Sequence, residues 1–580
     1  MEPVPEAHNI ADSWLASFAA ALSARNPEAV ADVFLPNGWL RDILTFTWDN
    51  RSLEGKQKII RYVADALPGL SFSEVKLSED KHFLPTYVPL PSGQEVEFGY
   101  TFETSIAYGK GLVRLLENEQ GVWKALIVST ILDDLKGHEE SLGGTIINTH
   151  VSWSIVEEER RARIESNPHV LIVGAGQTGL NIAARFRQMN IPTLVIEQNQ
   201  HVGDNWRQRY QSLTLHTIRH HHEMLYQRYP TTWPLFTPRD KMATALETYA
   251  MSHDLVVWTS SRIKGRPQYD SNSHKWTVTV DRDGTDALLF PSHIILSTGY
   301  WGGPYMPELP GKDEFKGNFL HSSQYKDPLA YHDMDVVVIG AGNSSIDICE
   351  DLALNGAKSV TMIQRSSTCV VSRENASKRQ SQLWKPDVPT EVADFRFAST
   401  PLGYWKKLMM NMQTEQWARE TELHTKLTKG GLKLNLGPEG QGQPLLVFER
   451  GGGYWIDKGG ADLIASGKIK IKQGIEPNAF TSTGLKFTDG SELTVDAVIF
   501  ATGYISMRVI SKNLFGAEII DRTCDIWGLD EEGELQGNFR PSGHPGLWYT
   551  AGDFFTSRFL SKHLAMHIKA MELGLQAVKA

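Results

Sequence analysis

Two glycine-rich turns, each set between an apolar segment and a helical pattern, constrain this chain more than any other feature. The first spans Gly174–Gly179 and the second spans Gly340–Ser345. Glycines in such a turn allow a tight bend, close approach of a pyrophosphate and close packing of helix on strand. One turn of this kind is weak evidence. Two in one chain predict two dinucleotide-binding units, each built on a buried parallel sheet.

The first turn is followed by an acidic residue at the expected place. After the helical pattern, a second apolar segment covers residues 193–196 and ends at Glu197. A carboxylate there accepts hydrogen bonds from an adenosine ribose, while amide groups at the helix start hold the phosphates. The predicted residues of this first site are Gly174, Gly176, Gln177, Thr178, Gly179, Glu197 and Gln198.

The second turn differs in two ways. Its third position is Ser345 instead of glycine, which predicts a slightly wider gap between helix and strand. Its partner segment, residues 359–363, leads into Arg365 and no carboxylate. A guanidinium is always charged and forks well onto phosphate, so Arg365 favours NADPH over NADH; a plain surface arginine is the alternative. The predicted residues are Gly340, Gly342, Asn343, Ser344, Ser345, Arg365 and Ser366.

Composition excludes several other classes of function. The 580 residues are too many for one core, and the net charge of -10 without a basic block argues against a nucleic-acid partner. The three cysteines form no paired or zinc motif, and His220–His222 are interpreted as structural, so no metal site is predicted. No secretory signal pattern and no membrane-spanning apolar run is found, and we expect a cytoplasmic protein.

Several segments resemble the flavin-containing monooxygenases, in particular their YUCCA-like and fungal-type branch. The segment Phe315–Tyr325 matches the monooxygenase fingerprint at Phe315, Gly317, His321 and Tyr325, where His321 is interpreted as a linker between domains. The resemblance runs from about residue 168 onward and implies FAD in the first site and NADPH in the second. It implies these further cofactor-binding residues: Gly203, Asn205, Trp206, His216, Thr217, Thr298, Thr502, Gly503 and Asp553.

The resemblance also implies a reaction. NADPH reduces the flavin, and the reduced flavin reacts with dioxygen to a C4a-(hydro)peroxide that oxygenates a small organic molecule. The outcome is N or S oxygenation, or YUCCA-like oxidative decarboxylation of a 2-oxo acid. Because the flavin carries the chemistry, no catalytic side chain is assigned. Three alternatives stay open: a Baeyer–Villiger monooxygenase, disfavoured by Tyr325 where that branch has tryptophan; an NADPH oxidase producing hydrogen peroxide; and a non-catalytic flavin-dependent sensor or scaffold.

Residues 1–135 predict a separate α+β unit with helices first and a curved antiparallel sheet after them. Trp14 and Phe18 belong to a helical stripe, and Val96 and Phe98 to an alternating strand. The unit resembles NTF2/SnoaL-like cone domains, which often pair, so a homodimer is left open. The predicted fold class is α/β, with two Rossmann-like domains after this cone. The predicted division is 1–135 cone, 136–165 linker, 166–330 FAD-binding, 331–495 NADPH-binding with a substrate-wall insertion, and 496–580 FAD-binding return.

Overall fold

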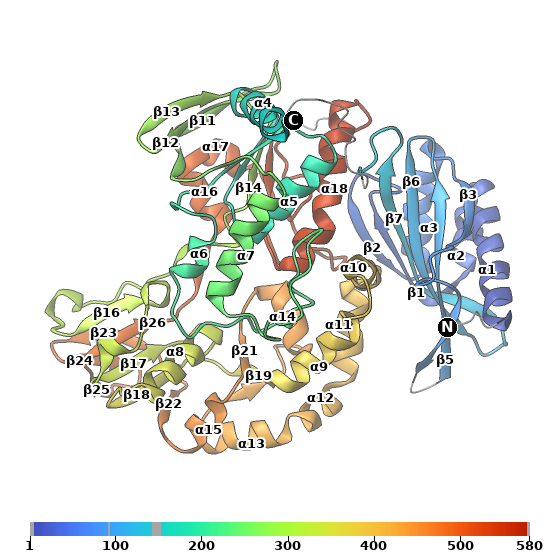
Figure 1. Ribbon diagram of the computed structural model, residues 1–580. Helices are drawn as coiled ribbons and strands as arrows, with labels where there is room; N and C mark the ends of the chain where they lie inside the picture. The colour runs from blue at the N-terminus through green and yellow to red at the C-terminus, as the bar shows by residue number, and fades with distance from the viewer. Residues whose placement is uncertain (1–4, 91–92, 142–151, 577–580) are drawn as a thin grey trace.

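The computed structural model describes residues 5–90, 93–141 and 152–576. Figure 1 shows a small amino-terminal unit, in blue, beside a larger body that contains the rest of the chain. The larger body is built around two five-stranded sheets, and both are parallel throughout. The predicted α/β class with two Rossmann-type units is confirmed.

The first sheet has the strand order β10-β9-β8-β14-β28. Its apolar strands are almost entirely buried, because helices cover a parallel sheet on both faces. The helices that follow its strands are α5 (Gln177–Gln188), α7 (Arg239–Ser252) and α18 (Phe554–Glu572). Its strands are β8 (Val170–Val173), β9 (Thr193–Ile196), β10 (Val257–Trp258), β14 (His293–Leu296) and β28 (Leu547–Tyr549).

The second sheet has the order β16-β26-β17-β18-β22, and helix α8 (Asn343–Leu354) follows β17. Its strands are β16 (Asn318–His321), β17 (Asp335–Ile339), β18 (Ser359–Gln364), β22 (Ile469–Gln473) and β26 (Ala497–Phe500). Strands β16 and β26 therefore pair within the second sheet, although the expected division put both of them on the FAD side. We propose that the chain crosses between the units near residues 305–317 and 501–504.

Helices between the two halves of the second unit form a separate layer. They are α9 (Arg373–Leu383), α10 (Thr390–Ala398), α11 (Leu402–Asn411), α12 (Gln413–Arg419), α13 (Thr421–Lys429) and α14 (Gly442–Arg450). Short sheets and helices complete the larger body: β11 (Ser261–Asp270), β12 (Lys275–Arg282), β13 (Thr285–Leu289), β15 (Trp301–Pro304), β19 (Thr368–Ser372), β20 (Leu434–Asn435), β21 (Tyr454–Asp457), β23 (Pro477–Thr481), β24 (Gly484–Phe487), β25 (Glu492–Thr494), β27 (Tyr504–Ser506), α6 (Asp204–Arg207), α15 (Gly460–Ala465), α16 (Met507–Phe515) and α17 (Ala517–Ile520).

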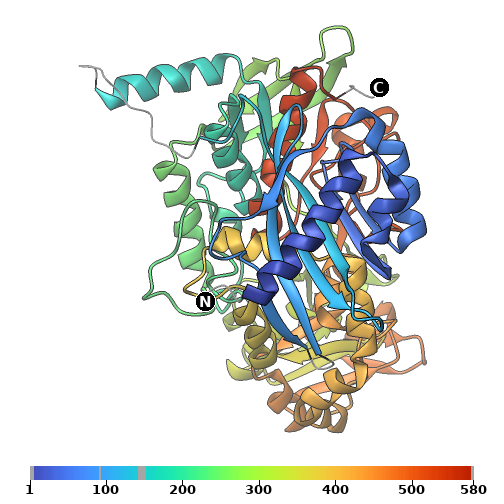
Figure 2. The same cartoon turned by 90° about the vertical axis from the view of Figure 1, so that its right-hand side faces the viewer.

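The amino-terminal unit has three helices on one face of a seven-stranded sheet, and Figure 2 shows α1 lying across that sheet. The predicted helical stripe with Trp14 and Phe18 lies in helix α1, and Pro27 occupies the first turn of α2. The elements are α1 (Pro5–Ser23), α2 (Pro27–Asp32), α3 (Lys56–Ala66), β1 (Phe34–Ile43), β2 (Asn50–Glu54), β3 (Ser73–Leu77), β4 (Thr86–Leu90), β5 (Gly93–Glu103), β6 (Ala107–Glu117) and β7 (Trp123–Leu135).

The expectation of an antiparallel sheet in this unit is wrong for one pair of strands, since β1 and β7 run parallel. These strands lie at opposite ends of the unit's sequence. Two strands joined by a short hairpin must be antiparallel. The relative direction of strands far apart in the sequence depends on the path of the whole chain between them.

The connection to the larger body contains α4 (Trp153–Ser166), which is rich in charged side chains and has no buried residue. Residues 142–151 of the predicted linker lie outside the described residues. Across the described part of the chain, every helix is too short or too polar to cross a bilayer.

Candidate cofactor and substrate site

The turn between β8 and α5 has the geometry that a pyrophosphate requires. A Cβ added to Gly179 would lie 2.0 Å from the Gly174 carbonyl oxygen, so the helix packs as close to the turn as predicted. A Cβ on Gly176 would meet only the Asn205 amide, at 3.7 Å, which leaves open space before the helix. No side chain caps α5. Its first amide groups are therefore available to an anion, as an FAD pyrophosphate needs.

Glu197 stands at the end of β9, beside this turn. Its carboxylate accepts hydrogen bonds from the Ala175 amide at 2.9 Å and from the Asn199 amide group at 2.7 Å. The Asn199 backbone amide also donates to Oε1, so both lone pairs of Oε1 are used and Oε2 keeps one lone pair for a ribose hydroxyl. Gln198 is exposed next to it.

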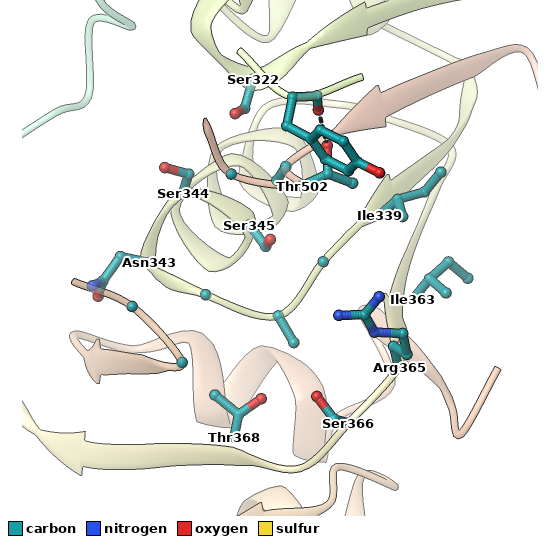
Figure 3. Close-up of a pocket in the computed structure, with 18 of the residues that line it drawn as sticks. Ser322, Ile339, Asn343, Ser344, Ser345, Ile363, Arg365, Ser366, Thr368 and Thr502 are labelled. Carbon is teal, nitrogen blue, oxygen red and sulfur yellow. Dashed lines mark hydrogen bonds between the residues drawn. The ribbon is translucent and has the colours of Figure 1, made fainter. Parts of the chain in front are cut away.

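The second turn opens into a cavity of about 660 Å³, here called the nucleotide cavity. No side chain caps α8, whose start forms one wall. Figure 3 shows the Arg365 guanidinium entering this space from the side opposite Asn343. Ser345 is fully buried against Gly340, which accommodates the side chain where a glycine was expected. The predicted residues that line this cavity are Gly340, Gly342, Asn343, Ser344, Ser345, Arg365, Ser366, Thr502 and Gly503.

The Arg365 guanidinium is accessible to a phosphate group that enters the nucleotide cavity. Its side chain is 77% exposed, and its one ion pair, with Glu476, is loose at 3.5 Å. An exposed pair of this kind contributes little to stability, so it yields readily to a phosphate group.

A second cavity, of about 360 Å³, adjoins the first and is here called the aromatic cavity. Asn343, Ser344 and Tyr454 line both cavities, which therefore meet at the start of α8. Trp206, His216, Thr217 and Asp553, expected on the flavin side, line the aromatic cavity. Five further aromatic side chains line it: Trp384, Phe397, Trp405, Phe448 and Phe555.

Asp553 caps α18 and is paired with a histidine that sequence reasoning did not single out for the site. His221 lies with its Nε2 3.3 Å from the Asp553 carboxylate. Although burial opposes ionisation, the hydrogen bond and charge of His221 lower the pKa of Asp553 to about 2. The carboxylate is therefore ionised at the edge of the aromatic cavity at neutral pH.

Asp347 is the second carboxylate that lines the aromatic cavity. The Tyr210 hydroxyl donates to it at 2.5 Å, and Lys458 lies 2.8 Å away. Burial works against ionisation, but the hydrogen bond and charge of His216, together with Lys458, hold the pKa of Asp347 below its usual range. This group is neutralised by its own partners and does not present a free negative charge to a ligand.

The fingerprint residues lie outside both cavities and contact residues of the second unit. His321 is buried, and its Nε2 lies 3.0 Å from the Gly503 carbonyl oxygen. The buried Tyr325 donates its hydroxyl to Asp351 at 2.9 Å. A Cβ on Gly317 would lie 2.3 Å from the Asp496 carbonyl oxygen, and Phe315 packs beside it.

The remaining predicted residues lie near the first turn or within the packing between elements. Gly203 has a φ of 90° and packs against the Ala243 carbonyl oxygen of α7, while Asn205 faces the Gly176 turn. Thr298 donates to the Met507 sulfur at 3.0 Å. The adjacent histidines contact protein groups, as His222 does with Thr237 at 2.8 Å, and no cluster able to hold a metal occurs among the described residues.

Residues from helices far along the chain complete the site, and sequence reasoning missed them. Arg379 and Gln380 of α9 line the aromatic cavity, as does Gln443 of α14. Ala376, Arg379, Gln380 and Leu383 follow a helical spacing that could have indicated one lining face. Of the aromatic and methionine stripe in α11, Trp405 reaches the cavity.

Comparison with known proteins gives three findings. A family model described as pyridine nucleotide-disulphide oxidoreductase matches residues 171–400. Indole-3-pyruvate monooxygenase YUCCA8 of Oryza sativa subsp. indica is 29% identical over 392 residues, which is 66% of this chain and 83% of that protein. Probable indole-3-pyruvate monooxygenase YUCCA1 of Arabidopsis thaliana is 29% identical over 344 residues, 58% of this chain and 75% of that protein.

Among solved structures, cyclohexanone monooxygenase with bound epsilon-caprolactone matches with a TM-score of 0.51 at 14% identity, covering 70% of this chain and 89% of that one. This likeness concerns the fold. Cys349 and Cys369 are buried and unpaired, and Cys524 is also free, so the dithiol pair of a disulphide reductase is not formed.

Proposed function

We propose that the chain is a flavin-containing monooxygenase that uses FAD and NADPH and oxygenates a small aromatic carboxylic acid. The preferred reaction is oxidative decarboxylation of an aromatic 2-oxo acid. The 2-oxo acid, NADPH, dioxygen and a proton give the shorter acid, carbon dioxide, NADP⁺ and water. The curated relatives named as indole-3-pyruvate monooxygenases support this choice.

The observation that carries the proposal is Arg379 in the aromatic cavity. Its guanidinium donates to the Gln443 side-chain oxygen at 2.8 Å, and among the described residues it forms no ion pair. Burial lowers the pKa of Arg379 to about 10, so the group is still charged at neutral pH. Arg379 is partly buried, and a substrate carboxylate would give its guanidinium a direct ion pair with paired hydrogen bonds.

The walls of the cavity favour a flat apolar body attached to that anion. Phe397 stands at the centre of a cluster, with its ring 4.7 Å from Phe555 and 5.4 Å from both Trp384 and Trp405. Edge-to-face aromatic packing of this kind accepts another ring well. The cavity wall also carries charged and polar groups, among them Arg379 and Gln443, that can fix the orientation of a small ligand.

The cofactor residues fit this assignment. The uncapped start of α5 and Glu197 would hold the FAD pyrophosphate and ribose; the uncapped start of α8 and Arg365 would hold NADPH. FAD reduced by NADPH supplies the electrons that activate dioxygen. The protein orients the substrate through Arg379, excludes water with the aromatic wall, and keeps Asp553 ionised through His221.

A substrate panel tests the proposal. Purified holoenzyme is given NADPH and phenylpyruvate, indole-3-pyruvate, thioanisole or cyclohexanone, and products are identified by mass spectrometry. The proposal expects the aryl acetate and carbon dioxide in equal amounts from the 2-oxo acids. A sulfoxide or a lactone as the main product would favour N or S oxygenation or Baeyer–Villiger chemistry instead. Hydrogen peroxide equal to the NADPH consumed, with every compound, would identify an oxidase.

A further inference from the structure

Figure 1 shows helix α10 beside the sheet of the amino-terminal unit. It carries Phe397, which lines the cavity, and it is followed by α11 with Trp405, which also lines the cavity. Neither cavity described above is lined by a residue of the amino-terminal unit. Any influence of that unit on the substrate must therefore pass through the wall that it touches.

One side of α10 faces inward. Asp394 accepts two hydrogen bonds from the buried Arg558 of α18, at 2.7 and 2.8 Å, and a third from the Trp384 indole at 2.8 Å. Phe397, three residues later on the same side of the helix, packs against the Trp384 ring. These contacts tie the helix to the aromatic cavity.

The other side of α10 rests on the sheet of the amino-terminal unit. Phe395 packs edge-to-face on Phe83 with ring centres 5.1 Å apart, and the Lys110 ammonium lies 5.2 Å from the Phe395 ring centre. Arg396 donates to the Glu97 carboxylate at 3.0 Å and to the His82 carbonyl oxygen at 2.8 Å. The helix is therefore held from both sides.

Arg41 of β1 secures the end of the helix. It is 9% exposed and makes a two-pronged ion pair with Glu534, which is 2% exposed, at 3.0 and 2.9 Å. Its remaining terminal nitrogen donates to the carbonyl oxygens of Ala398 and, at 3.1 Å, Thr400. Carbonyl groups at a helix end have no partner within the helix, and here a side chain from another unit supplies one.

The interior of the amino-terminal unit is filled by its own side chains. Phe98, Tyr100 and Phe102 are buried, and a Cβ on Gly111 would lie 2.2 Å from the Tyr100 ring. The buried Asp42 carboxylate receives hydrogen bonds from backbone amides and from the Tyr62 hydroxyl.

From these contacts we infer that the amino-terminal unit is a positioning domain for the substrate wall, with Arg41 as its central positioning residue. Its sheet and Arg41 fix α10 and the turn into α11, and thereby fix Phe397 and Trp405. This inference rests on the proposal that the aromatic cavity holds the substrate. It gives a mechanistic role to a unit that contributes no residue to either cavity.

The test compares two matched ion pairs of the same interface. The variant Arg41→Met with Glu534→Met removes the pair that holds α10. The control, Arg51→Met with Glu532→Met, removes a neighbouring pair between β2 and the same carboxy-terminal loop, at 2.6 Å, that does not contact α10. Because both partners are removed, no uncompensated buried charge remains.

Three measurements are made on each FAD-loaded protein: amide hydrogen exchange of residues 390–411, the dissociation constant of phenylpyruvate by tryptophan fluorescence, and NADPH consumption. For the Arg41 pair we expect faster exchange in residues 390–411 and binding weaker by about tenfold, with the KM for NADPH unchanged. The control pair should leave all three unchanged. Equal effects of both pairs, or unchanged exchange with the Arg41 pair, would overturn the inference.

Two further arms keep the test decisive. If the Arg41 pair does not fold, Arg396→Gln replaces it, since that change removes the contacts with Glu97 and His82 from the helix surface. The same increase in exchange is expected, and its absence counts against the inference. Failure of the wild-type protein to bind any aromatic acid would overturn the proposed function, while hydrogen exchange would still decide whether Arg41 holds α10.

Discussion

The Nε2 of His321 lies 3.0 Å from the carbonyl oxygen of Gly503. The Ser323 amide donates to the other ring nitrogen at 3.1 Å, so the proton is on Nε2 and His321 donates to Gly503. This bond connects the fingerprint strand β16 to the segment that leaves β26, and Gly503 lines the nucleotide cavity. The histidine therefore fixes backbone at the NADPH site without touching the cavity.

Replacing this histidine should weaken NADPH selectively. In His321→Ala the Gly503 carbonyl loses its buried donor, at a cost of about 1–3 kcal/mol. We expect the KM for NADPH to rise several-fold with FAD content unchanged. Ser323→Ala keeps the amide that faces the ring and serves as the control. Unaltered NADPH kinetics in His321→Ala would refute a positioning role for this residue.

Two glycines of the first turn should respond differently to the same substitution. In Gly176→Ala the new methyl group meets open space in the protein, so the apoprotein should fold normally and lose FAD, which absorbance at purification reports. In Gly179→Ala the methyl group would collide with the Gly174 carbonyl oxygen, at a cost of about 1–3 kcal/mol in the free energy of unfolding. A Gly176→Ala protein that retains full colour would contradict the placement of FAD.

Arg365→Ala should change the choice of nicotinamide nucleotide. The guanidinium is the charged group in the nucleotide cavity suited to a 2′-phosphate, and its loss should raise the KM for NADPH by about tenfold, with little effect on NADH. Steady-state kinetics with both nucleotides measure this. Glu476→Gln, which frees Arg365 from its ion pair, is the control and should not weaken NADPH. Equal losses for both nucleotides would remove the assignment.

Arg379→Met should discriminate charged from neutral substrates. Loss of a charge-assisted hydrogen bond should raise the KM for an aromatic 2-oxo acid by about tenfold to a hundredfold, while a methyl ester of the same acid is little affected. Arg209→Met, which removes an exposed arginine at the same cavity, provides the comparison. An Arg379 variant that treats acid and ester alike would show that the anion binds elsewhere.

A buried histidine predicts loss of stability in acid. Burial, with the nearby His169, lowers the pKa of His293 from 6.5 to about 3, and its ring accepts from the Trp548 indole at 3.2 Å. Below pH 6.5 the unfolded chain therefore binds this proton and the folded protein does not. Between pH 6.5 and about pH 5 this residue should cost about 2 kcal/mol of stability, and His293→Asn should not show that loss. Urea unfolding of both proteins at pH 6.5 and pH 5 measures the free energy of unfolding. An equal loss of stability in the wild type and in His293→Asn would contradict the prediction.

The positions of the glycine turns were predictable because their signal is local. Apolar segments, positive-φ glycines such as Gly174 and Gly340, and the helices that follow are encoded within about thirty residues of sequence. The part of the nucleotide cavity formed by residues 340–345 and by Arg365 follows directly from that pattern. The direction of β1 against β7 was not predictable in this way, because the two strands are far apart in the chain.

Local patterns in the chain were enough to predict two strand-turn-helix units, FAD and NADPH as their ligands, and an additional amino-terminal unit. Only the tertiary structure brought Arg379 of α9, Tyr454 of β21 and Asp553 before α18 to one cavity, and placed Arg41 at the end of α10. The reason is physical: turn geometry depends on neighbouring residues, whereas a cavity and its charges depend on how distant helices pack, and packing is set by the whole core.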